Sequence, residues 1–349
     1  MPVNVRQAKD AARAWVAQEA AHLPGFAGAF FHGSIAWLPD DAPLPPASDV
    51  DVIVVRDAPG PQTKLGKLRS RDVILDVSAL LDADLRSPAH VLSQYHLAGS
   101  LRAASIIADP SGRLTALQAA VARDYAKRRW VAARCAHARA KVERNLRSWH
   151  ESDPLSDQVT AWLFAAGVTT HVLLVAGLRN PTVRRRYLAV RDLLADYGRR
   201  DFYAPLLGLL GCAALTQAQA EHHLAALADA FDAAAATIRT PFSFAADISD
   251  LARPIAIDGS RELIAAGNHR EAVFWLVATY ARCQMVLAHD APPATYAQHD
   301  RGFRALLADL GIASPADLRD RTAQVAALLP DVWMMAEAIM AANPEIEDG

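Results

Sequence analysis

The chain has 349 residues, of which 52% are hydrophobic and 21% are charged, and its formal net charge is −2. This balance excludes an intrinsically disordered protein, and the length predicts two compact units. Cys135, Cys212 and Cys283 lie far apart in the sequence, which excludes a CxxC metal site and a disulfide framework. The net charge is also too small to predict a nucleic-acid partner.

No apolar run approaches the ~20 residues that a membrane-spanning helix needs. The most apolar segment, residues 161–177, is interrupted by Thr169, Thr170 and His171. Charged residues stand near the N-terminus where the apolar core of a signal peptide would lie. We therefore expect a cytoplasmic protein without a membrane partner.

Basic residues are concentrated in the first part of the chain. Residues 1–150 contain 20 lysines and arginines against 14 aspartates and glutamates, whereas residues 151–349 contain 16 against 24. A basic segment suits a polyphosphate ligand, and an acidic segment suits a cationic one. The asymmetry favours different ligands for the two halves.

In chain order, the first part of the sequence reads as one helix followed by short strands. Alanines around Trp15 and Val16 predict a helix at residues 5–22, which ends before Pro24. Apolar and β-branched runs predict the strands, and a turn signal at residues 109–112 ends the last of them. The strands are expected at residues 26–31, 49–55, 73–78 and 106–107.

Beyond residue 112 the pattern is almost entirely helical. A long segment without proline or glycine predicts one helix at residues 114–149. We predict an α+β protein, with a small mixed sheet in residues 1–112 and an all-α helical domain in residues 113–349. In that domain a connecting helix at 113–150 leads into a bundle at 151–349, with helices at 156–178, 182–198, 202–211, 216–239, 268–289, 301–311 and 330–342.

Two aspartates, Asp49 and Asp51, lie at alternate positions of a predicted strand, so their side chains point to the same face. Asp76 lies in the next predicted strand between apolar neighbours, where a carboxylate is costly unless it is paired or binds a metal. Mg²⁺ prefers oxygen ligands of this kind. We expect Asp49 and Asp51 to bind Mg²⁺, and Asp76 to act as a third ligand or as the acceptor of a proton.

The Gly33-Ser34 pair follows the first predicted strand. Glycine permits close approach of a ligand to the backbone, and backbone N–H groups together with the serine hydroxyl can bind phosphate oxygens. By itself a Gly-Ser pair is weak evidence for a phosphate-binding site, because the chain contains others, such as Gly99-Ser100. Its value comes from the aspartate strand that follows it.

The order of strand, Gly33-Ser34, Ser48-Asp49-Val50-Asp51 and a strand bearing Asp76 resembles the polymerase-β-type nucleotidyltransferase superfamily. A small catalytic domain followed by a helical domain is similar to the enzymes that adenylylate aminoglycoside or lincosamide antibiotics. The motifs cover about residues 26–80. The connection at 35–48 is longer and richer in proline and aspartate than is usual in that superfamily.

This resemblance implies a Gly-Ser grip on a nucleoside triphosphate, with ATP as the usual donor, and two aspartates that bind Mg²⁺. It implies in-line attack of an acceptor on the α-phosphorus, with pyrophosphate as the leaving group. We expect the acceptor to be a hydroxyl of a small molecule, which the acidic second half suggests is a cationic antibiotic.

Other charged residues are candidates for binding the two substrates. Lys127 and Lys141 fall on one face of the predicted long helix and could contact the phosphates, although a solvated helix face explains them as well. Asp258, Glu262 and Glu271 lie around a predicted break in the bundle and are candidates for acceptor binding, but helix capping also accounts for the first two.

Two further functions stay open from the sequence. One is a toxin-type nucleotidyltransferase that modifies tRNA or a protein, which a continuous basic surface linking the cluster at residues 184–186 to Asp49 would favour. The other is a noncatalytic nucleotide-binding regulatory protein.

Overall fold

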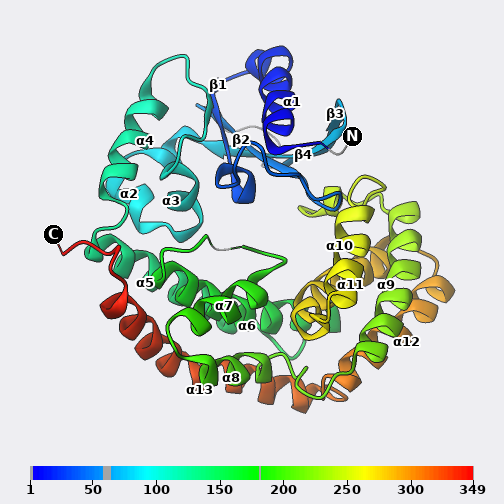
Figure 1. The fold of residues 1–349 in the computed structure, drawn as a ribbon. Coiled ribbons are helices and arrows are strands. Elements are labelled where there is room, and N and C mark those ends of the chain that lie inside the picture. Colours follow the sequence, from blue (N-terminus) through cyan, green and yellow to red (C-terminus); the bar gives the residue numbers. More distant parts are fainter. Residues whose placement is uncertain (1–2, 58–63, 181, 349) are drawn as a thin grey trace. The chain divides into compact units, whose positions relative to one another are not determined.

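The computed structural model describes residues 3–57, 64–180 and 182–348, and it divides into two compact units (Figure 1). Unit 1 contains Met1–Arg134 together with Glu345–Gly349, and unit 2 contains Cys135–Pro344. A mixed sheet in the N-terminal part is followed by a helical region, which confirms the predicted α+β class.

The sheet of unit 1 has five strands in the order β3-β4-β2-β1-β5. Strand β2 pairs in parallel with β4, while the other neighbouring pairs are antiparallel. The four predicted strands are present, and β3 is an additional one. The strands are β1 (Phe26–Phe31), β2 (Val50–Arg56), β3 (Lys64–Ser70), β4 (Val73–Leu81) and β5 (Ile106–Ala108).

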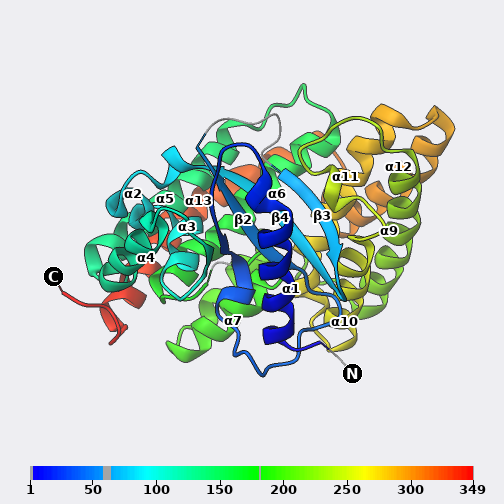
Figure 2. The same ribbon diagram turned by 90° about the horizontal axis from the view of Figure 1, so that it is seen from above.

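One face of this sheet is covered by helix α1 (Val5–Gln18), which crosses the strands in Figure 2. Helix α1 buries Val5, Ala8, Ala12 and Val16, whose spacing gives it one apolar face. The core beneath it contains side chains from β1, β2 and β4, among them Val50, Val52, Val54, Leu75 and Val77. Because side chains alternate along a strand, Asp51 and Asp76 lie on the opposite face of the sheet.

The sequence did not predict strand β3. It pairs with β4 in a hairpin whose tight turn contains Arg71 at a positive φ of 52°. The register shifts between Lys64 and Gly66, which breaks the period-two alternation that marks a strand. Glycine and basic residues also give β3 little of the β-branched content that strands usually have.

The predicted long helix at residues 114–149 is wrong as one element. It consists of α4 (Arg113–Asp124) and α5 (Arg128–Arg147), separated by a short turn. In this turn, residue 127 forms a bridge with Glu347, and the amide of Arg128 donates to the carbonyl of Glu347 over 2.9 Å. The pairing with the C-terminal residues therefore accounts for the break.

The two units divide within α5, between Arg134 and Cys135, whereas the sequence predicted a boundary after residue 112. Helix α4 packs against two short helices of unit 1, α2 (Pro88–Ser93) and α3 (Tyr95–Leu101), and against β5. These contacts keep α4 with the sheet.

The regular secondary structure of unit 2 is helical in its described residues. Its helices after α5 are α6 (Leu155–Ala176), α7 (Arg186–Asp196), α8 (Tyr203–Gly208), α9 (Gln217–Thr237), α10 (Gly259–Ala265), α11 (His269–Asp290), α12 (Pro293–Asp309) and α13 (Pro315–Ala342). A π-helical turn at Pro254–Asp258 precedes α10. Helix α13 begins at Pro315 and not at the predicted residue 330. A proline is typical of the first turn of a helix, but Pro330 lies inside this one.

Two helices, α6 and α13, are long and apolar enough to cross a membrane by length and composition. The apolar stretch of α6 is 83% buried inside unit 2, where α6 packs against α7, α11 and α13. Its apolar character is therefore that of a core helix. The corresponding stretch of α13 is 33% buried.

Candidate metal centre

Three carboxylates meet on the face of the sheet opposite α1. Asp51 in β2 stands directly beside Asp76 in β4 in the parallel register, and Asp49 immediately precedes β2. One oxygen from each of the three lies within 4.8 Å of the others. Among the described residues, this is the grouping of three potential ligands that could hold a metal ion. The expectation that Asp76 completes the cluster is confirmed.

A lysine on the unpredicted strand β3 belongs to the same cluster. Lys67 faces Asp76 across the antiparallel β3–β4 pair. Its Nζ donates to Oδ2 of Asp49 over 2.5 Å and to Oδ2 of Asp76 over 2.6 Å. The Lys67 side chain is only 5% exposed, so both hydrogen bonds are shielded from water.

The charges of this cluster depend on one another. Burial by itself would lower the pKa of Lys67, but attraction from Asp49 and Asp76 and their hydrogen bonds outweigh it and raise the pKa above its ordinary value. The ammonium therefore stays charged at neutral pH. Three carboxylates against one ammonium leave an excess of negative charge, which a divalent cation can neutralise.

The loop after β1 touches this cluster through Gly33. The amide of His32 donates to the carbonyl of Asp51 over 2.9 Å, and Gly33 then begins a 3₁₀ turn, Gly33–Ala36. Gly33 has a φ of 63°, and a Cβ atom here would overlap Oδ2 of Asp51. Glycine is thus required both by the left-handed backbone and by the approach of the carboxylate.

Ser34 follows with an exposed side chain. The first N–H groups of such a turn have no acceptor within it, so they and the serine hydroxyl can bind an oxyanion. The structure therefore places Gly33 beside Asp51, with Ser34 next along the same loop.

His32 fixes the other side of this loop. Its Nδ1 lies 2.7 Å from Oγ of Ser100, which is buried in α3. Burial lowers the pKa of His32 to about 4, so the imidazole is neutral at pH 7. Ser100 belongs to one of the other Gly-Ser pairs, and its role here is to hold His32.

The two lysines predicted to bind phosphate do not share a helical face. Lys127 lies in the turn before α5, and its Nζ pairs with Asp124 at 2.7 Å. Lys141 is inside α5 and belongs to unit 2. The prediction that Lys127 and Lys141 share one helical face was wrong, because the helix does not continue through residue 127.

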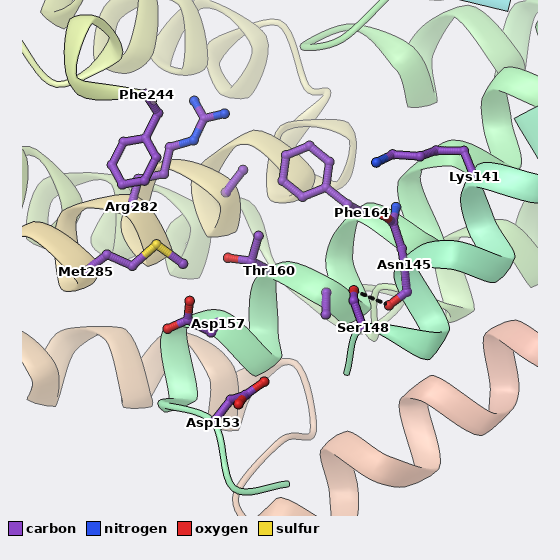
Figure 3. Close-up of a pocket in the computed structure, with 12 residues that line it drawn as sticks. Lys141, Asn145, Ser148, Asp153, Asp157, Thr160, Phe164, Phe244, Arg282 and Met285 are labelled. Atoms are coloured by element: carbon purple, nitrogen blue, oxygen red, sulfur yellow. Dashed lines mark hydrogen bonds between the residues drawn. The ribbon is translucent and has the colours of Figure 1, made fainter. Parts of the chain in front are cut away.

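Lys141 lines a cavity of about 430 Å³ within unit 2. Figure 3 shows Lys141 and Asn145 projecting from α5 beside the ring of Phe164, while Asp153 and Asp157 lie at the other end of the cavity. A size of this order is typical of small-ligand pockets. Its wall thus combines apolar surface with charges of both signs.

The three acceptor candidates lie in different environments of unit 2. Glu271 is buried in α11, and its Oε1 accepts from Arg191 and from the hydroxyl of Tyr203, each over 2.8 Å. Asp258 pairs with Arg261 at the surface, and Glu262 is exposed. Asp258 precedes α10 without a side-chain capping bond, so capping does not explain it. The structure does not bring these three together.

Two of the three arginines at 184–186, Arg184 and Arg186, are held by contacts within unit 2. Arg184 donates to the carbonyl of Ile255 over 2.9 Å. Arg186 is 2% exposed, and its guanidinium lies 3.8 Å from the centre of the Phe274 ring. Arg186 therefore does not contribute to a basic surface at residues 184–186.

No protein-family model matches the chain, and no curated protein matches it. The function of the protein is therefore inferred from the residues of the site.

Proposed function

We propose that the protein is a Mg²⁺-dependent nucleotidyltransferase. The observation that carries this proposal is the contact of the Gly33 loop with Asp51, in a cluster where Asp51 and Asp76 are register partners. Such a cluster can hold a cation, and the adjoining loop offers N–H groups to a phosphate. A metal-bound triphosphate needs both features side by side.

The residues have distinct roles in this mechanism. Asp49 and Asp51 would hold Mg²⁺, which when bound supplies charge stabilisation at the α-phosphoryl group. Gly33 and Ser34 bind the β- and γ-phosphates through backbone N–H groups and the hydroxyl. Asp76 lies on the same face and serves as a third ligand or accepts the proton of the attacking hydroxyl. The acceptor oxygen bonds to the α-phosphorus as the bond to pyrophosphate breaks.

The donor and acceptor follow from the resemblance and from charge. ATP is the proposed donor, and the acceptor is a hydroxyl of a small molecule. The acidic second half supports a cationic acceptor such as an aminoglycoside. Arg184 and Arg186 are engaged within unit 2, which counts against tRNA as the acceptor. The cytoplasm, where ATP is supplied, is the proposed location.

The test is release of pyrophosphate from each of the four ribonucleoside triphosphates with Mg²⁺, against aminoglycosides, lincosamides and bulk tRNA. We expect acceptor-dependent release with a cationic antibiotic, and Asp51→Asn to lower it at least about a hundredfold through loss of a metal ligand. Asp57→Asn is the matched control, because Asp57 follows the same strand but is exposed.

Three outcomes separate the alternatives. Release that depends on tRNA would replace the small-molecule acceptor with a nucleic acid. Absence of release, with Mg²⁺-dependent nucleotide binding retained, would favour a regulatory protein. Equal rates in Asp51→Asn and the wild type would reject the metal centre as the site of catalysis.

A further inference from the structure

Lys67 occupies the position of a cation inside the carboxylate cluster. Across the adjacent strands β2, β4 and β3, the residues in register are Asp51, Asp76 and Lys67. The Lys67 ammonium bridges Oδ2 of Asp49 and Oδ2 of Asp76 over 2.5 and 2.6 Å. The ammonium thus takes one of the two oxygens that each of these carboxylates can offer to a metal ion.

The burial of Lys67 shows that the arrangement is built into the sheet. Its side chain is 5% exposed, and those of its partners Asp49 and Asp76 are 22% and 14% exposed. Removing a lysine from water is costly unless it is paired and hydrogen-bonded, as it is here. Displacing the ammonium would require a new partner for Nζ.

Lys67 reduces the number of carboxylate oxygens that further cations can use. It also contributes one positive charge beside the three carboxylates of Asp49, Asp51 and Asp76, as a bound cation would. Two-metal sites place their ions about 3.5–4 Å apart, and both ions need carboxylate oxygens. With Oδ2 of Asp49 and Oδ2 of Asp76 bound to Nζ, the cluster has fewer carboxylate oxygens left for a pair of ions.

We propose that Lys67 takes the place of a second divalent ion, so that the centre holds one ion at Asp49 and Asp51 and keeps a fixed ammonium between Asp49 and Asp76. Lys67 is in this sense a positioning residue, because it acts through the carboxylates. The inference rests on the proposed function only in assuming that the cluster binds a divalent cation together with a triphosphate.

The test counts metal ions with Mn²⁺ as the probe. The full chain is mixed with one equivalent of an ATP analogue that cannot be cleaved between the α- and β-phosphates, and Mn²⁺ is titrated while electron paramagnetic resonance reports the free ion. We expect one Mn²⁺ per complex, with no magnetic coupling between ions. In Lys67→Met we expect two Mn²⁺ with the dipolar coupling of a close pair.

Two variants serve as controls. Lys67→Arg keeps the positive charge and should bind one ion. Lys9→Met removes a lysine of α1 that lies outside the cluster, where its Nζ pairs with Asp40 at 2.8 Å. This variant should also bind one ion. If Lys67→Met does not fold, the wild-type count still decides the question.

The outcomes distinguish this inference from the proposed function. Two coupled Mn²⁺ ions in the wild type would overturn the role of Lys67 and leave the nucleotidyltransferase proposal intact. A single uncoupled ion in folded Lys67→Met would also overturn it. If the wild type binds no Mn²⁺, even with the nucleotide analogue, the metal centre and the proposed function both fail.

Discussion

At the scale of single residues, the centre depends on how closely the loop after β1 approaches Asp51. Gly33 has two separate reasons to be glycine, which are its positive φ and the position of Oδ2 of Asp51. Any other residue at this position would have to shift either the backbone of the loop or the carboxylate of Asp51. The separation of the Gly33 loop from the carboxylate of Asp51 is therefore fixed by the absence of a Cβ atom at residue 33.

Gly33→Ala should weaken metal binding about tenfold, because the new Cβ displaces the carboxylate of Asp51 from the cluster. It should also lower the free energy of unfolding by about 1–2 kcal/mol through the left-handed backbone. Mn²⁺ affinity and urea unfolding measure the two effects separately.

Gly112→Ala is the matched control for this change. Gly112 has a φ of 75° in the same unit, but a Cβ there would meet no atom within 4 Å. It should lose a similar amount of stability and keep its Mn²⁺ affinity. Equal Mn²⁺ affinities in both variants would show that Gly33 does not govern the position of Asp51.

The three carboxylates of the site could be predicted from residue types, but the buried lysine among them could not. Asp49 and Asp51 were predicted because a DxD pair in a β-branched strand is locally visible, and Asp76 because a carboxylate between apolar residues needs a partner. The partner of Asp76 is Lys67. The sequence indicated only that Asp76 needs a partner, and not which residue supplies it. Finding Lys67 required knowing which strand pairs with β4.

At the scale of elements, predictions from the sequence failed where one segment depends on another distant in the chain. Strand β3 has a register shift at Gly66 and is stabilised by its pairing with β4. The turn between α4 and α5 coincides with backbone pairing to Glu347. Strand β2 and helix α6 were predicted well because their own apolar patterns determine them.

Three helices of unit 2 are joined by one buried carboxylate. Glu271 on α11 accepts from Arg191 on α7 and from Tyr203 at the start of α8. Burial, with the nearby charge of Glu271, raises the pKa of Tyr203 well above its ordinary range, so the phenol remains a donor. This environment favours a structural role for Glu271 over acceptor binding.

Glu271→Gln should lower the free energy of unfolding by about 1–3 kcal/mol, because Arg191 loses its charged acceptor in a shielded site. Chemical denaturation measures this loss. Glu262→Gln, at an exposed position of α10, should change stability by less than about 0.5 kcal/mol. A stable Glu271→Gln protein with impaired acceptor binding would instead support the role predicted from the sequence.

At the scale of the whole molecule, each unit contains a histidine that folding keeps neutral. Burial lowers the pKa of His32 in unit 1 to about 4, and burial followed by the nearby Arg186 lowers that of His171 in unit 2 to about 3. In the unfolded chain both return to about 6.5. Above about pH 6.5 both histidines are neutral in the folded protein and in the unfolded chain, so they do not make stability depend on pH there.

Stability should therefore fall as the pH drops from about 6.5 toward 4, because the unfolded chain then binds protons that the folded protein excludes. The loss is at most about 1.4 kcal/mol per pH unit for each histidine. Urea unfolding at about pH 7 and pH 5 measures it. The difference should shrink in His171→Gln and stay the same in His150→Gln, whose histidine is exposed. An unchanged difference in His171→Gln would remove that residue from the explanation.

The return of the C-terminal residues to unit 1 has a consequence for synthesis. Glu347 pairs with the backbone around Lys127, and Ile346 beside it is buried. Every residue of unit 2 leaves the ribosome before these contacts can form. The sheet that carries the metal ligands is translated early, yet its unit is completed only when the intervening helices have already emerged. A premature stop within α13 would therefore damage a unit whose own sheet had been translated in full.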